Sequence, residues 1–331
     1  YTNNFNKEKL GYFPFVTVHY AESDLDYRKS TIAAGFHFTT IDWLDKVGYD
    51  RLLCWGFEEI DLTYRSIEAG YEIINYKHTP IYHLYEYSLQ KQINHKTNKN
   101  LPNHIGIILD GNRRYAKSIG LSLDLAYEAG SNKLEQVLEW LWDLGVKIVS
   151  VWVFSTENFN RDEQQIQTIM KKAEEKTIEI RDDKKIKDRK VQIRYSGEIK
   201  RLDESLQNQI KITEESTKNH SNHILNICLG YGGRQELTSA IRNIAKKIQS
   251  GNIDVNDIDE NLIHEHLYTN GLPDPDLIIR TSGSVRLSGF MTWQSTYSEL
   301  YFTDVLWPNF RKVDLLRAIR AFQARNRNYG H

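Results

Sequence analysis

The chain alternates short apolar runs with longer segments whose apolar residues recur at helical spacing. Six runs fit buried β-strands, because each is short and bounded by polar residues or glycine. They are residues 104–110, 147–155, 190–197, 224–230, 276–281 and 299–305. Between them, residues 134–144 and 237–248 place apolar side chains on one helix face, with Gly145 and Gly251 as stops. This alternation predicts an α/β fold with a six-stranded, mostly parallel sheet flanked by helices.

A polar, basic stretch interrupts the chain before the first of these strands. Residues 88–101 read SLQKQINHKTNKNL and show no apolar period, which is typical of a linker. We therefore expect a small α/β fragment in residues 1–87 and a larger α/β domain in residues 102–331. With 331 residues, the chain is long enough for two such domains.

The composition excludes several classes of function. Hydrophobic residues make up 40% and charged residues 26%, as in globular proteins. The net charge of −1 leaves no basic field for general nucleic-acid binding. Cys54 and Cys228 lie too far apart in sequence for a metal or redox motif, and so few cysteines fit a reducing cytoplasm. No apolar run approaches the length needed to cross a bilayer.

The first strand of the larger domain ends in an unusual group of charges. Asp110, Gly111 and Asn112 follow the apolar run and precede Arg113 and Arg114. The arginines offer forked donors to phosphate oxygens, and Gly111 would let the backbone approach a ligand. Asp110 would repel a phosphate unless a cation lay between them, which favours Mg²⁺ held by one carboxylate and substrate phosphates. An Asp-Gly turn with solvated arginines is the alternative, and the spacing alone favours neither.

Two further strand ends are rich in hydrogen-bond donors. Residues 154–161 (FSTENFNR) follow the second strand, where the alternative is a helix cap by Thr156 or Asn160 ahead of a helix that begins near Asp162. Residues 278–288 (IIRTSGSVRLS) follow the fifth strand, and their arginines, serines and glycine suit an anion nest. A surface loop is the alternative there, although an unpaired arginine leaving a buried strand would be costly.

Three anion-suited strand ends on one sheet imply more than one phosphate group, carried by one diphosphate substrate or by two. The carboxyl ends of parallel strands meet at one edge, where such sheets bind their ligands. The chain contains neither a P-loop nor a dinucleotide-binding glycine motif, so ordinary nucleotide binding is disfavoured. Gly232 and Gly233 also lie between a strand and a helix, and we expect a tight turn there.

Residues 102–329 resemble the cis-prenyltransferases, the undecaprenyl diphosphate synthase family. The blocks that carry the resemblance are HIGIILDGNRRYAKSIGL, VFSTENFNR, LNICLGYGGRQEL, DPDLIIRTSGSVRLSGF and WQSTYSELYFTDVLWPNF, in that order. The resemblance implies a homodimeric parallel α/β fold. It also implies Mg²⁺-dependent condensation of isopentenyl diphosphate with an allylic diphosphate, such as farnesyl or geranylgeranyl diphosphate. The product would be a long-chain cis-polyprenyl diphosphate that serves as a lipid carrier.

The resemblance also implies roles for individual residues. Asp110 matches the aspartate that holds Mg²⁺ and the allylic diphosphate, and Asn112 matches an asparagine that assists departure of diphosphate or removal of a proton. Glu299 matches a glutamate that approaches the metal site across the dimer. We expect Asn158 to share in catalysis. The remaining expected diphosphate-binding residues are Gly111, Arg113, Arg114, Tyr127, Phe154, Ser155, Phe159, Arg161, Arg280, Arg286 and Ser288.

The first block is expected to hold the departing diphosphate and the fourth to grip the incoming isopentenyl diphosphate. Three positions depart from the family pattern. Tyr127 and Val285 stand where many members have histidine, and Gly289 stands where they have asparagine. Tyr127 can still donate a hydrogen bond to phosphate, but it cannot act as a base near neutral pH.

A growing apolar product needs an apolar tunnel, and one wall is expected on residues 166–180. The side chains predicted to form it are Ile166, Ile169, Met170 and Ala173, with ordinary core packing as the alternative. Because the product is a lipid, we expect a cytoplasmic protein with peripheral contact to a membrane surface. The basic run at residues 184–190 suits such contact, but a solvated loop is the favoured interpretation.

Residues 38–85 resemble the C-terminal part of a family 2 glycosyltransferase of the GT-A fold, through the motif WGFEEIDLTYRSIEAG. Glu58 and Glu59 would match the acidic pair of that family, and His83 would help at a metal or nucleotide. The upstream nucleotide-binding half is missing, and the Asp24-Leu25-Asp26 segment lies too close to the acidic pair for the usual metal motif. We expect a truncated or fused fragment without sugar transfer of its own.

Two other functions stay open beside prenyl transfer. One is a glycosyltransferase that acts on lipid-linked sugars through the N-terminal segment. The other is a non-catalytic subunit of a prenyltransferase heteromer. Silent subunits of that kind usually lack the aspartate of the first block, whereas Asp110 is present here.

Overall fold

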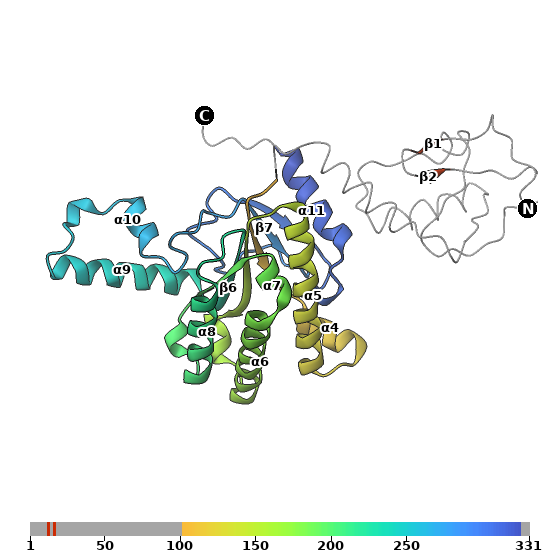
Figure 1. Cartoon of the computed structure of the whole chain (residues 1–331), viewed down its shortest axis with the longest axis horizontal. Coiled ribbons are helices and arrows are strands. Elements are labelled where there is room, and N and C mark those ends of the chain that lie inside the picture. Colours follow the sequence, from red (N-terminus) through yellow and green to blue (C-terminus); the bar gives the residue numbers. More distant parts are fainter. Residues whose placement is uncertain (1–11, 14–15, 18–100, 326–331) are drawn as a thin grey trace, which may run out of the picture. The chain divides into compact units, whose positions relative to one another are not determined.

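The computed structural model describes residues 12–13, 16–17 and 101–325 (Figure 1). The chain divides into two units, Tyr1–Lys96 and Thr97–His331. In the first unit, the strands Tyr12–Phe13 (β1) and Val16–Thr17 (β2) pair antiparallel. The other N-terminal predictions lie outside the described residues and stay predictions. They concern Asp24, Asp26, Glu58, Glu59, His83 and positions 88–100 of the proposed linker.

Six parallel strands form the central sheet of the second unit. They are β3 (His104–Ile108), β4 (Ile148–Ser155), β5 (Val191–Ser196), β6 (His223–Tyr231), β7 (Leu277–Arg280) and β8 (Glu299–Phe302). Their order across the sheet is β5-β6-β4-β3-β7-β8, and every neighbouring pair runs parallel. All six predicted strands are confirmed, with small shifts at their ends. The β3 strand is buried along its whole length, as expected where helices pack around a parallel sheet.

Helices and short 3-10 turns connect the strands. The helices are α4 (Asn112–Ile119), α5 (Leu123–Leu144), α6 (Glu163–Asp182), α7 (Lys184–Asp188), α8 (Glu204–Thr217), α9 (Gly233–Gln249), α10 (Glu260–Glu265) and α11 (Lys312–Ala324). The turns are η2 (Thr156–Asn160), η3 (Ile199–Arg201), η4 (Val255–Asp257) and η5 (Trp307–Asn309). Within residues 101–325, no helix combines the length and apolar character that a membrane span needs.

The α5 helix forms as its sequence predicts. Ser122 caps its first turn by accepting a hydrogen bond from the backbone N–H of Leu125, and Gly145 ends it with a φ of 95°. The predicted apolar face is largely buried. The predicted face of α9 is only partly right, because Ile244 is buried whereas Ile241 is 63% exposed. Figure 1 shows the reason: α9 and α10 extend away from the strands at the left of the view, so the sheet does not cover the whole helix.

The basic run at residues 184–190 is exposed at most positions, as predicted, but it is not a loop. Most of it forms α7, and two of its basic side chains pair with acidic residues of α5. Lys185 pairs with Glu139, and Arg189 Nη2 lies 2.6 Å from Asp143 Oδ1. The run is helical because Asp183 caps it, accepting a hydrogen bond from the backbone N–H of Lys185.

Gly232 and Gly233 do not form the predicted tight turn, because Gly232 has an extended backbone, with a φ of −156°, and Gly233 is already the first residue of α9. They are glycines because neighbouring groups approach too closely for a side chain. A Cβ on Gly232 would lie 2.4 Å from Thr156 Oγ1, and one on Gly233 would lie 2.3 Å from Thr292 Oγ1. The pair therefore lets the start of α9 pack tightly against Thr156 and Thr292.

Buried polar side chains link four strands of the sheet. His104 Nε2 lies 2.8 Å from Ser150 Oγ, Asn226 Nδ2 donates to the same hydroxyl at 3.0 Å, and Ser196 Oγ donates to Asn226 Oδ1 at 2.8 Å. His104 Nδ1 lies 2.7 Å from the carbonyl oxygen of Pro273 and must donate to it. Burial lowers the pKa of His104 to about 4, so the imidazole is neutral and Nε2 accepts from the serine.

Candidate active site

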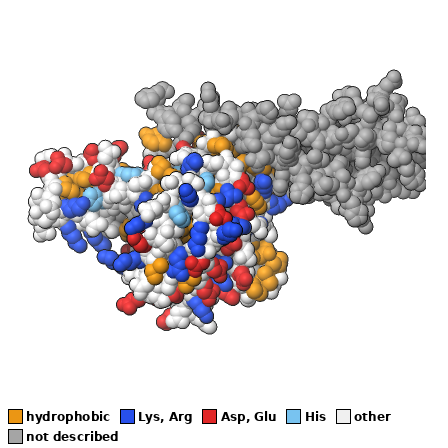
Figure 2. Space-filling view, viewed as in Figure 1, with side chains coloured by type: hydrophobic (Ala, Val, Ile, Leu, Met, Phe, Trp, Pro, Cys, Tyr) orange, Lys and Arg blue, Asp and Glu red, His pale blue; other side chains and the backbone are white. Residues whose placement is uncertain are grey.

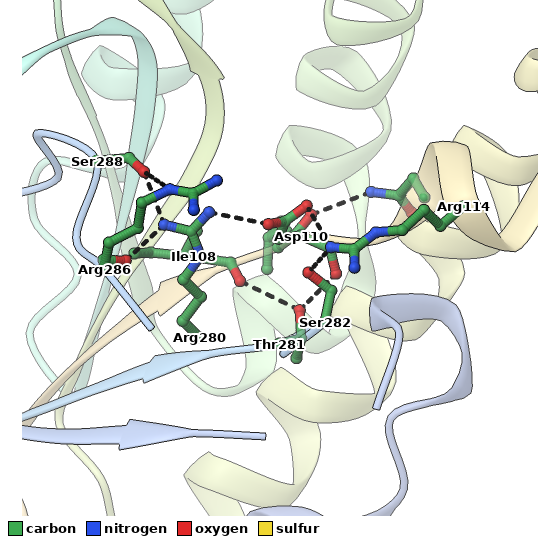
Figure 3. A network of polar contacts seen from close by, with 10 residues as sticks. Ile108, Asp110, Arg114, Arg280, Thr281, Ser282, Arg286 and Ser288 are labelled. Atoms are coloured by element: carbon green, nitrogen blue, oxygen red, sulfur yellow. Dashed lines mark hydrogen bonds and ion pairs between the residues drawn. The ribbon is translucent and has the colours of Figure 1, made fainter. Parts of the chain in front are cut away.

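Asp110 lies just beyond β3, between Arg114 of the following helix and Arg280, which is 170 positions away in the sequence (Figure 3). Its backbone oxygen accepts hydrogen bonds from Thr281 Oγ1 at 2.6 Å and from the N–H of Trp307 at 3.1 Å. Its carboxylate lies 2.9 Å from Arg280 Nη2 and 3.7 Å from Arg114 Nη2. The side chain stays 32% exposed, so a ligand can still reach it.

Arg280 ends β7 and is almost fully buried, with 5% of its surface exposed. Its Nη1 donates to Ser288 Oγ at 2.8 Å and to the backbone oxygen of Arg286. Arg286 Nε donates to the same serine hydroxyl at 3.2 Å. The alternative of a surface loop is therefore wrong for Arg280, whereas Arg286 and Ser288 are exposed. The three residues predicted to grip one diphosphate do lie together.

The loop that carries this group is held in an unusual backbone conformation. Ser282, Ser288 and Met291 have φ values of 77°, 53° and 47°, in a region that residues with a side chain rarely occupy. Arg114 Nη2 donates to Ser282 Oγ and thereby ties this loop to α4. Strained residues of this kind cluster at binding and catalytic sites, where the surrounding contacts hold them in place.

Asn112 begins α4 and carries a buried oxygen without a partner. Its Nδ2 donates to the backbone oxygen of Leu109 at 3.1 Å, whereas its Oδ1 has no hydrogen-bond partner among the described residues. The amide lies against Gly130 of α5, where a Cβ would come within 2.3 Å of Oδ1. Trp307 Nε1 donates to the Gly130 backbone oxygen at 2.8 Å and fixes that wall. A buried acceptor without a hydrogen-bond partner is unusual in a native protein, and it suits a side chain that accepts a hydrogen bond from a ligand or takes up a proton.

Gly111 precedes α4 with a φ of 116°. A side chain there would lie 3.0 Å from the Cα of Leu306 and 3.1 Å from the backbone nitrogen of Trp307. Packing against the segment after β8 therefore requires this glycine, in addition to any approach of a ligand.

The second strand end forms the compact turn η2. Ser155 N–H donates to Asn158 Oδ1 at 3.2 Å, and the Ser155 side chain accepts from the Asn158 backbone in return. Phe154 is buried and meets Phe159 edge-on, with ring centroids 5.0 Å apart. The guanidinium of Arg201 lies 4.1 Å over the Phe159 ring, so this residue supports the turn from behind.

The predicted helix caps in this block are wrong. Asp162 itself caps α6 by accepting a hydrogen bond from the N–H of Gln164 at 2.9 Å, so neither Thr156 nor Asn160 does so. Thr156 and Asn160 are therefore not needed to cap α6. Arg161 Nη1 instead donates to the hydroxyl of Tyr127 on α5 at 3.3 Å.

A cavity of about 670 Å³ begins at these strand ends and continues between the sheet and α6. Its polar part includes Asp110, Gly111, Asn112, Arg113, Arg114, Tyr127, Ser155, Asn158, Arg161 and Arg280. Its apolar part includes Leu134, Trp152, Val153, Phe154, Ile169, Ala173, Ile180, Ile227 and Leu229. The predicted α6 wall is confirmed for Ile169 and Ala173. Ile166 does not line the cavity, and Met170 is buried in the core instead.

Glu299 does not meet Asp110 within one chain. It begins β8 and pairs in register with Leu277, whereas the site lies at the other end, where Arg280 pairs with Phe302. Its carboxylate pairs with Arg325. Within residues 101–325, no three His, Cys, Asp or Glu side chains gather as metal ligands. One carboxylate beside a group of arginines fits Mg²⁺, which is commonly held by one or two carboxylates plus substrate phosphates.

The fold and the site together define a class of enzyme. The sheet is parallel, arginines and one carboxylate lie at its strand ends, and an apolar cavity lies behind them. The substrate of this class has an anionic head for the arginines and an apolar chain for the cavity. The comparisons with known proteins agree with that class. Residues 108–330 match the family model described as "Putative undecaprenyl diphosphate synthase". The chain therefore belongs to the undecaprenyl diphosphate synthase family and is a prenyltransferase.

Two curated relatives and a solved structure resemble most of the chain. An isoprenyl transferase of Thermus thermophilus is 44% identical over 255 residues, which cover 76% of this chain and 96% of the relative. A tritrans,polycis-undecaprenyl-diphosphate synthase (geranylgeranyl-diphosphate specific) of Methanopyrus kandleri is 45% identical, with 76% and 92% covered. The structure of lavandulyl diphosphate synthase from Lavandula x intermedia superposes with a TM-score of 0.66 at 33% identity. That superposition covers 70% of this chain and 99% of the plant enzyme.

These comparisons confirm the predicted family and fold of the larger domain. The family match begins at residue 108, and neither the two relatives nor the plant enzyme is a glycosyltransferase. The resemblance of residues 38–85 therefore stays a prediction. Sequence reasoning also gave no role to several residues that build the site. Gly130, Thr281 and Trp307 shape it through backbone and packing contacts, and only the isolated glycine within a helical pattern gave a signal.

Proposed function

We propose that this chain condenses isopentenyl diphosphate with an allylic diphosphate and extends the product to a long-chain cis-polyprenyl diphosphate. The observation that carries the proposal is the cavity, because one continuous space joins the arginine-rich strand ends to apolar walls. A diphosphate head fits the first part and a prenyl chain fits the second. Geranylgeranyl diphosphate is the primer that the name of the Methanopyrus relative suggests, and farnesyl diphosphate is the alternative.

The arginines supply most of the anion binding in this proposal. Arg114, with its neighbours in the first block, holds the diphosphate that leaves the allylic substrate. Arg280 and Arg286, ordered by their shared contact with Ser288, hold the incoming isopentenyl diphosphate. Departure of diphosphate leaves an allylic cation and a concentrated negative charge. Fixed donors already aimed at that charge lower the barrier, because they need no reorganisation.

Asn112 is the residue we assign to proton removal or to assisting departure of the diphosphate. Its Oδ1 has no partner in the described structure, and Leu109 and Gly130 fix the orientation of the amide. Asn158 is a weaker candidate, because its side chain already accepts from the N–H of Ser155. Tyr127 and Arg161 form a hydrogen-bonded pair on the cavity wall, and their positions suit contact with an anionic head.

Asp110 would hold Mg²⁺ together with oxygens of the allylic diphosphate. The ion, when bound, would neutralise charge on the leaving group. A homodimer in which the partner's copy of Glu299 approaches this site also stays a proposal, and so does location in the cytoplasm. The chain retains the first-block aspartate, which argues against the alternative of a non-catalytic subunit. Turnover by the purified chain without any partner protein would exclude that alternative.

The direct test is Asp110→Asn, assayed by incorporation of labelled isopentenyl diphosphate into a geranylgeranyl primer. We expect a loss of about 10²–10³-fold in kcat, the scale of losing one preorganised electrostatic contact. Circular dichroism must accompany the assay, because Asp110 is an ionic partner of buried Arg280. Asp124→Asn is the matched control, since it removes a carboxylate that lines the same cavity. Near-normal incorporation by folded Asp110→Asn would overturn the assigned role.

A further inference from the structure

Four apolar side chains are exposed where α4 ends and α5 begins. Ile119 is 53% exposed, Leu121 36%, Leu123 37% and Leu125 50%. They fall within seven consecutive residues, and Figure 2 shows a hydrophobic group over this corner of the domain, at the lower right of the view. We call these four residues the α4–α5 patch. Exposed apolar side chains gathered in this way mark surfaces that bind something, whereas scattered ones need no explanation.

The surroundings of the patch indicate what it binds. Lys117 precedes it, Asp124 lies within it, and both line the cavity, so the patch borders the cavity's rim. The α4 helix that leads to it has Lys117 in its last turn and no acidic residue, and Lys117 is the basic residue of this helix that the proposed diphosphate binding does not need. Apolar residues beside basic ones are typical of segments that lie in the interface of a bilayer carrying anionic lipids.

We propose that the α4–α5 patch docks this domain on the surface of an anionic lipid bilayer, next to the rim through which the polyprenyl chain passes. The inference rests on the proposed function, because that function makes the product of the cavity a lipid. A long prenyl chain that leaves the cavity at this rim would pass into the membrane without crossing water.

The α4–α5 patch fits a membrane contact better than the basic run at residues 184–190, for which a solvated loop was the favoured interpretation. Lys185 and Arg189 of that run pair with acidic residues of α5, so their charge is already compensated. The run also lacks a group of exposed apolar residues beside it, since its isoleucine, Ile186, is buried. The α4–α5 patch has both features that interfacial binding needs.

The test measures binding of the full chain to phosphatidylcholine vesicles with and without phosphatidylglycerol, by sedimentation and in the absence of substrates. The variant Leu121→Ser/Leu125→Ser should bind anionic vesicles about tenfold more weakly, because each leucine then loses its contact with acyl chains. The matched control is Ile212→Ser/Ile241→Ser, which removes apolar side chains that are 49% and 63% exposed and do not line the cavity. The control should bind like the unmodified chain, and added salt should weaken binding of both.

Three outcomes would overturn the proposal. The first is that the unmodified chain does not bind anionic vesicles at all. The second is equal weakening by the control variant, which would show that the patch has no special part. The third is a changed molecular mass of the patch variant in solution, which would show that a second copy of the chain covers the patch instead. Prenyl transfer measured in detergent with a short primer reports on the proposed function separately, and the patch variant should retain it.

Discussion

Gly130→Ala places one methyl group against the side chain that we assign to proton transfer. The new Cβ would lie 2.3 Å from Asn112 Oδ1 and 3.3 Å from Trp307 Cδ1, whereas ordinary contacts begin near 3.4 Å. Trp307 is fully buried and its indole N–H is held by the Gly130 carbonyl, so it cannot give way easily. The amide of Asn112 must therefore move by about 1 Å, away from the position that its bond to Leu109 sets.

The same substitution has opposing effects on stability. Replacing glycine by alanine inside a helix favours folding by about 0.5–1 kcal/mol. Overpacking of a well-packed region costs about 1–3 kcal/mol. The net loss is at most about 2.5 kcal/mol, against a typical total of about 5–15 kcal/mol, so the variant should fold. A catalytic group displaced by about 1 Å typically loses on the order of 10²-fold in rate, and we expect that loss in kcat.

Steady-state incorporation of labelled isopentenyl diphosphate, with thermal unfolding alongside, measures both effects. Gly145→Ala is the control. Its φ of 95° strains an alanine, so the variant should lose stability. A Cβ added there would meet no atom within 4 Å, so kcat should stay unchanged. The double variant Asn112→Ala/Gly130→Ala should be no slower than Asn112→Ala alone. A further large loss in the double variant, or a normal kcat in folded Gly130→Ala, would refute the reasoning.

Three further predictions follow from other contacts. Ser288→Ala removes an acceptor of Arg280, so the KM for isopentenyl diphosphate should rise about tenfold, and a change confined to kcat would contradict this. Ala173→Phe fills part of the cavity and should shorten the products seen by chromatography, whereas Met170→Leu, in the core, should leave their length unchanged. Burial lowers the pKa of His104 to about 4, so as the pH falls the unfolded chain binds a proton at this histidine before the folded chain does. The stability that His104 contributes is therefore complete above about pH 6.5, and up to about 3 kcal/mol of it is lost as the pH falls toward 4. His104→Gln should flatten that part of the pH dependence of urea unfolding, and an unchanged slope would count against the assignment.

The strands were predictable because their signal is local. A run such as residues 104–108 is apolar almost throughout, and burial on both faces leaves no other good place for it. The order of strands was not predictable in the same way. β3 lies between β4 and β7, and its pairing with β7 joins Ile105 to Leu277 across most of the domain. No local pattern records such a pairing, and the same limit explains why the exposure of Ile241 on α9 was missed.

In the site, too, local features could be predicted from the sequence and long-range contacts could not. Arg280 could be assigned to an anion site because a charge that ends a buried strand needs a partner. Its partners could not be predicted from spacing, since Asp110 lies 170 positions away in the sequence. Gly130 was still harder, because its role is the absence of a side chain where Asn112 needs room. A glycine whose missing side chain leaves room for a neighbouring residue gives almost no signal in the sequence.

The contacts of Asp110 change the simple division between a departing and an incoming diphosphate. Arg280, assigned to the incoming group, contacts the carboxylate assigned to the metal, and Arg114, assigned to the departing group, donates to Ser282 of the other block. The arginines and the carboxylate therefore compensate one another in this structure. Phosphates that draw the arginines away would leave Asp110 in need of a cation, and a cation at Asp110 would release the arginines for phosphate. The two proposed diphosphate sites would thus be coupled through shared charges, and removing any one of these side chains should disturb both.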